Sequence, residues 1–386
     1  MCEPGSMSYF RIFQFPTLLL AGASAFSMST LFSAMKPVLL TRYVEQAGFS
    51  ESLAGLVVAM PFVGIALSSL LLNKLLGLMP LRLLVIVFGG LLTTTELVSA
   101  YVFDFKALVL TLQFFAGISV GVLTGSVSRI IATQTLADEM FGFVDMAAVF
   151  LMSFMIAGVG AAIGALGLEG GYLFAAALSL GYTLLMLAHN TNDGQQGGIV
   201  KFSKPLLISL RPIAVIIMGM LFVTCSGFGF AFLFTIGIDL GMSYASAGSF
   251  IGTLVLVSSL ACQLGGWSSG KFGPYRPLAG AYIVCAVGWY VAIHASSQLI
   301  FMIALVPAIF SLQFNFPILL ALSGSLDAEG RWAAIATPLL MSGFAWAAIV
   351  AGAIVSVWGI PALATATGLG LLICLLLLIP SREATV

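Results

Sequence analysis

Two carboxylic acids within long apolar segments are the side chains best suited to bind and release a proton. Glu96 lies in the apolar segment 81–101 with no cation beside it, and Asp145 lies in the segment 141–166. A charge inside a membrane costs at least about 2.5 to 3.5 kcal/mol on insertion scales, so a buried acid needs water, a partner or a proton. The alternatives are a Glu96 carboxylate near the outer headgroups and an ion pair of Asp145 with Arg129 that helps close the inner end.

Polar groups in two further apolar segments have the chemistry to bind a small molecule. Lys36 lies near the outer end of the segment 17–40, where its ammonium either snorkels to the surface or attracts an anionic group. Gln313 and Asn315 lie near the middle of the segment 299–323. An amide there needs a hydrogen-bond partner or water, so the alternatives are an interhelical hydrogen bond and a contact with a bound molecule.

The residue pattern offers no site for catalysis or metal binding. Residues 117–121 match G-x-S-x-G, but a nucleophile elbow needs a strand-to-helix turn, and this serine lies inside a continuous apolar segment. The two histidines, His189 and His294, lie on opposite predicted sides. The five cysteines show no metal-type spacing and are interpreted as small apolar filler. We therefore predict no enzyme activity, no metal and no cofactor.

The elements that hold these residues are apolar enough to cross a membrane. Of the 386 residues, 61% are hydrophobic and only 7% are charged, against roughly 25% charged residues in a soluble domain. About 20 apolar residues in a helix span the hydrocarbon core. Twelve such segments occur, at 17–40, 52–72, 81–101, 107–131, 141–166, 171–188, 207–235, 245–267, 277–294, 299–323, 332–358 and 361–378. The sequence predicts an all-α, polytopic membrane protein.

Lysine and arginine collect on one side of this arrangement, which sets its orientation because cytoplasmic loops carry the excess. With both termini inside, 11 of the 14 basic residues are cytoplasmic, and only Arg42 and Lys106 lie outside. Acidic residues also number 14, so no net charge indicates a nucleic-acid partner. The N-terminus lacks the pattern of a cleaved signal peptide. We expect a multi-pass protein of the cell's inner (cytoplasmic) membrane.

The chain divides into two related halves. Its longest polar stretch between apolar segments, within 190–206, is rich in Gly, Asn and Gln and is expected to be a flexible cytoplasmic linker. We predict six-helix bundles at 1–189 and 207–386. Gly, Ser, Ala and Gly of 48–55 recur in 241–248, displaced by 193 residues. The segment 136–153 matches 325–342, displaced by 189 residues. Such duplication is common in secondary transporters, whose site lies between the repeats.

The loops after the second and eighth segments resemble the signature G-x-x-x-D-R-x-G-R-R of the major facilitator superfamily. In the second copy, Lys271 and Arg276 stand at basic positions of the signature. In the first copy, Lys74 follows Asn73, which occupies the aspartate position. The resemblance implies two pseudo-symmetric six-helix bundles, with these four residues in a cytoplasmic gate. Arg129 joins this gate through its expected ion pair with Asp145.

Glycine runs extend the resemblance. Residues 113–121 resemble the superfamily's fourth helix with Gln113 in place of its arginine, so that arginine's role in proton coupling is not carried over. Residues 158–164 resemble the glycine-rich element of antiporter branches. Glycines that recur every four residues leave one face of a helix without side chains, so a neighbouring helix can pack closely. This face serves either tight contact alone or tight contact between helices that also slide. They are Gly117, Gly121, Gly125, Gly160, Gly164, Gly248 and Gly252.

In the superfamily, the first, fourth, seventh and tenth helices line a central cavity, so the resemblance implies that polar and aromatic residues on these helices contact substrate. The candidates are Thr30, Lys36, Gln113, Phe228, Gln313 and Asn315. Thirty phenylalanines and few charges favour an amphipathic or weakly charged substrate over one that needs paired arginines.

These features predict a monomeric secondary active transporter that works by alternating access. The first hypothesis is proton-coupled efflux of a drug or metabolite, with Glu96 and Asp145 as the proton-coupling residues. The alternative is proton-coupled uptake of a small organic acid or nutrient, with Lys36 as its anion partner. A remoter alternative is a transport-inactive receptor or scaffold. The expected partners are a small molecule, protons and the lipid bilayer, and no nucleic acid.

Overall fold

The computed structural model describes residues 12–188, 206 and 209–381, and these residues form helices without strands. Residues 1–11, nearly all of the predicted linker 190–206 and the side chain of Lys36 lie outside the described part. The elements are η1 (Ile12–Gln14), α2 (Pro16–Glu45), α3 (Glu51–Leu78), α4 (Leu81–Leu84), η2 (Val85–Gly89), α5 (Gly90–Val102), α6 (Lys106–Ala132), α7 (Ala137–Leu187), α8 (Leu210–Ala231), α9 (Leu233–Asp239), α10 (Tyr244–Phe272), α11 (Tyr275–Ile293), α12 (Gln298–Gly324), α13 (Arg331–Trp358) and α14 (Ala362–Ser381).

Eleven helical stretches in the described part are long and apolar enough to cross a membrane, and one of them, α7, accounts for two crossings. The 51 residues of α7 would extend about 76 Å if straight, well beyond a hydrocarbon core of about 30 Å. The helix kinks at Gly167, whose φ of 66° is open to glycine but rarely to other residues. The all-α fold with twelve crossings is therefore confirmed.

Two predicted segments depart from regular helices, and one predicted loop is missing. The third crossing contains a π-helical turn, η2, which ends at Gly89 against Thr183 of α7. The seventh crossing breaks into α8 and α9 at Phe232. The loop expected after residue 166 is only the kink at Gly167. There the Gln46 side chain accepts a hydrogen bond of 3.0 Å from the Leu168 amide and so caps the helix that follows.

Close helix packing explains the glycines of α6. A methyl group at Gly117 would collide with the Pro61 carbonyl of α3, and one at Gly121 would collide with the side chain of Ser68. Without side chains at these positions the two helices approach closely, as membrane helices do where a hydrophobic driving force is lacking. The prediction of tight packing is confirmed for this helix.

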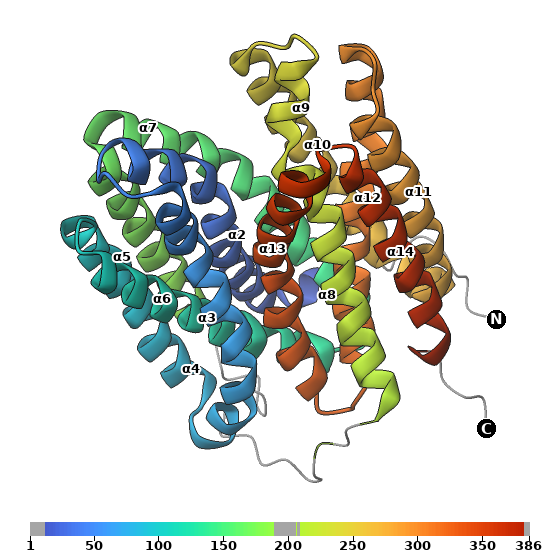
Figure 1. The fold of residues 1–386 in the computed structure, drawn as a ribbon. Coiled ribbons are helices and arrows are strands. Elements are labelled where there is room, and N and C mark those ends of the chain that lie inside the picture. The colour runs from blue at the N-terminus through green and yellow to red at the C-terminus, as the bar shows by residue number, and fades with distance from the viewer. Residues whose placement is uncertain (1–11, 189–205, 207–208, 382–386) are drawn as a thin grey trace.

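The two halves of the chain lie side by side (Figure 1). Helices α2 to α7, blue to green in Figure 1, occupy one side, and α8 to α14, yellow to red, occupy the other. Helix α10 packs against α7, and α13 packs against α3 and α6, so these pairs join the halves. The residues between the halves are therefore the ones that must change contacts if the halves move.

Candidate functional site

The halves touch firmly at one end, which we call the closed end, where α3, α6, α10 and α12 finish. On α7 and α10, a Cβ at Gly142 would lie 2.9 Å from the Cys262 carbonyl oxygen and 3.2 Å from the Gly266 Cα. A Cβ at Gly266 would collide with the Asp138 carbonyl. Both glycines are therefore required for this contact, because either side chain would push the halves apart.

A second contact closes the same end between α6 and the start of α13. A Cβ at Gly330 would lie 2.6 Å from the Arg129 carbonyl oxygen, and Arg129 lies in the field of Glu329 and Asp327. Arg331 bridges both acids, with nitrogen–oxygen distances of 3.0 Å to Asp327 and 3.3 Å to Glu329. The positive charge of one half thus meets the negative charge of the other.

The structure places Asp145 in the α7–α10 contact. Its side chain is 4% exposed and lies beside the thiol of Cys262 on α10. Arg129 lies among the acids that precede α13, so the neighbours that the structure gives to these two residues differ from the predicted ion pair. Asp145 must leave Cys262 whenever the closed end opens.

The other predicted gate residues lie at the closed end. Lys271 stands over two rings of its own helix, at 5.0 Å from the Trp267 ring and 5.3 Å from the Phe272 ring. Lys74 and Arg276 are exposed, and the buried side-chain oxygen of Asn73 has no hydrogen-bond partner among the described residues. A gating role for these residues stays a prediction.

The halves part at the opposite end, which we call the open end, where α2 and α5 finish and α10 begins. A Cβ at Gly160 or Gly164 of α7, or at Gly252 of α10, would meet nothing within 4 Å. A Cβ at Gly248 would meet only the Phe234 ring, at 3.8 Å. Among the described side chains, these glycines therefore lack the expected tight packing in this conformation.

The closed and open contacts lie on the same helix faces. Gly160 follows Gly142 by 18 residues and Gly248 precedes Gly266 by 18, which is five full turns of an α-helix in each case. Neither stretch contains proline, so each face continues straight. The faces of α7 and α10 therefore touch at one end and are apart at the other. The two ends are about 27 Å from each other along the helix axis, roughly the thickness of the hydrocarbon core.

The predicted substrate residues do not form one cluster. Phe228 is 4% exposed within the core of the second half, while Thr30 and Gln313 are half-buried. The Thr30 hydroxyl donates a 3.0 Å hydrogen bond to the Ser27 carbonyl. Gln113 turns into the interior of the first half. Substrate contacts by these residues stay a prediction.

The amide of Gln113 meets Glu96 inside the first half. The Gln113 Nε2 donates to Glu96 Oε1 at 3.4 Å and to Ser99 Oγ at 3.2 Å. Glu96 is 0% exposed, so it lies inside the helix bundle, and its Oε2 has no partner among the described residues. The alternative of a surface carboxylate is wrong, because α5 packs Glu96 against α6 and α7.

Two residues of this interior were not singled out from the sequence. The hydroxyls of Tyr43 and Tyr172 lie 2.6 Å apart, on α2 and α7, and both phenols lie in the electrostatic range of Glu96. In sequence each resembles an interfacial aromatic near a helix end. Their pairing depends on how α2 packs against α7, which no local pattern encodes.

Asn315 is a buried amide to which the described residues offer no hydrogen-bond partner. Its side chain is 0% exposed, and neither its nitrogen nor its oxygen has a hydrogen-bond partner among the described residues. The interhelical hydrogen bond predicted as one alternative is therefore not found there. Such a group destabilises the conformation that buries it, so it must have another reason to be present.

We expect Asn315→Leu to stabilise the protein, by about 1 to 3 kcal/mol, because it removes an unpaired buried amide at similar volume. Thermal unfolding of the purified protein measures this change. Gln113→Leu is the matched control, and it should lower stability because that amide is hydrogen-bonded. A less stable Asn315→Leu variant would show that the amide has a partner. Loss of transport in a stabilised variant would assign Asn315 to substrate.

Comparisons with known proteins agree with this architecture. A family model described as Major Facilitator Superfamily matches residues 17–337. A search of curated proteins finds no match. Solved structures similar in fold include the human organic anion transporter MFSD10 (TETRAN), with a TM-score of 0.75 and 16% identity over 97% of this chain and 100% of that one.

Two symporter structures show the same likeness. The E. coli fucose:proton symporter FucP has a TM-score of 0.71 and 15% identity, over 98% of this chain and 100% of that one. The proton:xylose symporter XylE has a TM-score of 0.73 and 15% identity, over 95% of this chain and 94% of that one. At such identities the likeness establishes the shared fold alone.

Proposed function

This chain belongs to the Major Facilitator Superfamily, and from that premise we propose that it is a proton-coupled secondary active transporter of a small amphipathic molecule. The observation that carries the proposal is the one-ended contact of α7 and α10, with Gly142 against Gly266 at the closed end and Gly160 apart from Gly248 at the open end. Alternating access requires two arrangements of one pair of faces, each closing one end. The observed faces, with small residues at both ends, are suited to both arrangements.

The closed end faces the cytoplasm in this proposal. Basic residues of the described part gather there, while Arg42 and Lys106 lie at the open end. The excess of lysine and arginine marks the cytoplasmic side. The conformation is then open to the outside. We expect a reporter that works only in the cytoplasm to be active when it is inserted within 190–206. Activity of a reporter that works only outside the cytoplasm, inserted at the same place, would reverse the orientation.

Efflux is the first choice of direction. Only 7% of the residues are charged and 30 are phenylalanines, which favours a substrate with apolar surface. The glycine-rich face of α7, around Gly160 and Gly164, resembles that of antiporters. Uptake of a small organic acid is the second candidate. It is supported by the names of the similar structures, which include proton symporters and an organic anion transporter, and by Lys36 in α2.

Flux in proteoliposomes tests the proposal. Vesicles with an imposed pH gradient are given a fluorescent lipophilic cation or a radiolabelled organic acid, and substrate movement is followed with the gradient in each direction. Antiport moves substrate against the proton flow, and symport moves it with the flow. Counterflow without a gradient separates a carrier from a receptor or scaffold. No counterflow of any compound in a broad panel, by protein that is folded, would overturn the transporter proposal.

A further inference from the structure

Glu96 occupies a compartment inside the first half, not between the halves. Helix α5 holds it against α6 and α7, and its hydrogen-bond partner Gln113 comes from α6. Both helices belong to the first half of the chain. A proton bound at Glu96 is therefore separated from a substrate that moves between the halves.

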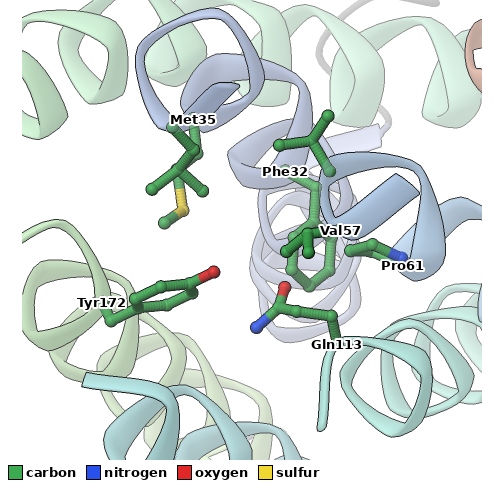
Figure 2. Close-up of a pocket in the computed structure, with 8 residues that line it drawn as sticks. Phe32, Met35, Val57, Pro61, Gln113 and Tyr172 are labelled. Carbon is green, nitrogen blue, oxygen red and sulfur yellow. The ribbon is translucent and has the colours of Figure 1, made fainter. Parts of the chain in front are cut away.

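A small pocket adjoins this compartment. It is lined by Gln113 and Tyr172 together with apolar residues such as Phe32, Met35 and Pro61, and it has room for about one water molecule. Figure 2 shows the Tyr172 hydroxyl and the Gln113 amide turned toward the centre of the pocket. The pocket is too small for a metabolite, but a single water there has polar partners.

The two tyrosines continue from the pocket toward the open end. The Tyr172 hydroxyl lies 2.6 Å from that of Tyr43, and the Tyr43 ring stacks on Phe49 at 5.0 Å. The Lys106 ammonium stands 5.6 Å from the Phe49 ring, and Lys106 is exposed. The Phe49 ring, which carries no exchangeable proton, thus lies between the buried Tyr43 and the exposed Lys106 at the surface of the open end.

Among the side chains that the structure describes, few titratable groups face the two tyrosines and Glu96. Tyr43 comes from α2 and Tyr172 from α7, and Asp104 in the turn after α5 acts on Tyr43. Helix α6 contributes the uncharged Gln113, and α3 contributes Val57, Val58 and Pro61 to the pocket wall. Of the described carboxyls, Glu96 alone acts on both phenols.

We propose that Glu96 exchanges its proton with the open end through pocket water and the Tyr172–Tyr43 hydroxyl pair, along a path inside the first half that the substrate does not share. Each hydroxyl passes its own proton to the next acceptor as it takes one from the previous donor, since a phenol both donates and accepts. The proton that Tyr43 gives up is replaced by one from bulk water at the open end when the Phe49 ring, which covers Tyr43, moves aside. The proposal deepens the proton coupling proposed above and rests on it.

Infrared spectroscopy of the purified protein in lipid tests this inference with protons as the only probe. The carbonyl band of a buried carboxylic acid is followed after a rapid pH change, and its exchange is followed in deuterated water. Asp145 is also a buried carboxyl, so we expect Glu96→Gln to remove one component of the band and Asp145→Asn to leave that component in place. Tyr172→Phe and Tyr43→Phe should keep the band and slow its exchange by about tenfold or more, equivalent to about 1.4 kcal/mol in barrier.

Tyr282→Phe is the matched control, because Tyr282 is equally buried but lies on α11 in the second half. It should leave the band and its exchange unchanged. The path is refuted if the tyrosine variants exchange at the wild-type rate. The site is refuted if Glu96→Gln removes no component of the band beyond the one that Asp145→Asn removes, or if sodium ions at constant pH abolish the Glu96 component. If Glu96 exchanges protons but the protein shows no counterflow, the transporter proposal is refuted and the proton path is not.

Discussion

A disulfide between cysteines introduced at Gly160 and Gly248 is expected to stop transport, and its reduction is expected to restore it. The two faces meet at Gly142 and Gly266, and the introduced cysteines lie five turns away on the same faces. A disulfide needs Cα atoms about 4.4 to 6.8 Å apart. The bond can therefore form only when the open end closes, and it then traps that state.

The measurement is counterflow before and after oxidation, in protein with Cys2 replaced by serine. The four other cysteines are buried and remain in place. The single variants and the mismatched pair Gly90→Cys with Gly248→Cys are the controls, because Gly90 also faces open space but lies on α5. Rapid cross-linking of Gly160→Cys with Gly248→Cys without any loss of counterflow would contradict alternating access at this interface.

Proton-driven accumulation is expected to collapse in Glu96→Gln while counterflow survives. One proton moved per substrate gives about 1.4 kcal/mol, or tenfold accumulation, for each pH unit of gradient. Glutamine keeps the size and the hydrogen bond to Gln113 but cannot take up a proton. The accumulation ratio should therefore fall to about one, because the halves still rock without coupling to the gradient.

Asp145→Asn is expected to lose accumulation as well, for a different reason. Asp145 lies beside Cys262 in the contact that must open, so its protonation is tied to the movement of the halves. Radiolabelled substrate in vesicles with and without a pH gradient measures both variants. Cys262→Ser, which keeps a small polar group beside Asp145, is the control and should retain accumulation. Normal accumulation by both acid variants would exclude both carboxyls from coupling.

The architecture was predictable from sequence because the membrane leaves few choices. A backbone in hydrocarbon must bond to itself, so a chain with 61% hydrophobic residues in runs of about 20 forms spanning helices whatever its finer details. The sequence did not predict the kink at Gly167 or the π-turn at Gly89. Gly167 lies against Gln46 and Gly89 lies against Thr183, and both of these contacts join residues that are distant in sequence. Both change the course of a helix without changing its hydropathy.

By itself, the sequence determined which residues are chemically unusual in their surroundings. Glu96, Asp145 and Asn315 stood out because a polar group in an apolar segment is costly. Tertiary structure alone decided their partners: it pairs Glu96 with Gln113, places Asp145 beside Cys262 and gives Asn315 no hydrogen-bond partner among the described residues. The free-energy cost of burying a polar group depends on the apolar segment that contains it, which the sequence shows. The hydrogen-bond partner that offsets this cost comes from another helix, whose rotation and depth are set by packing.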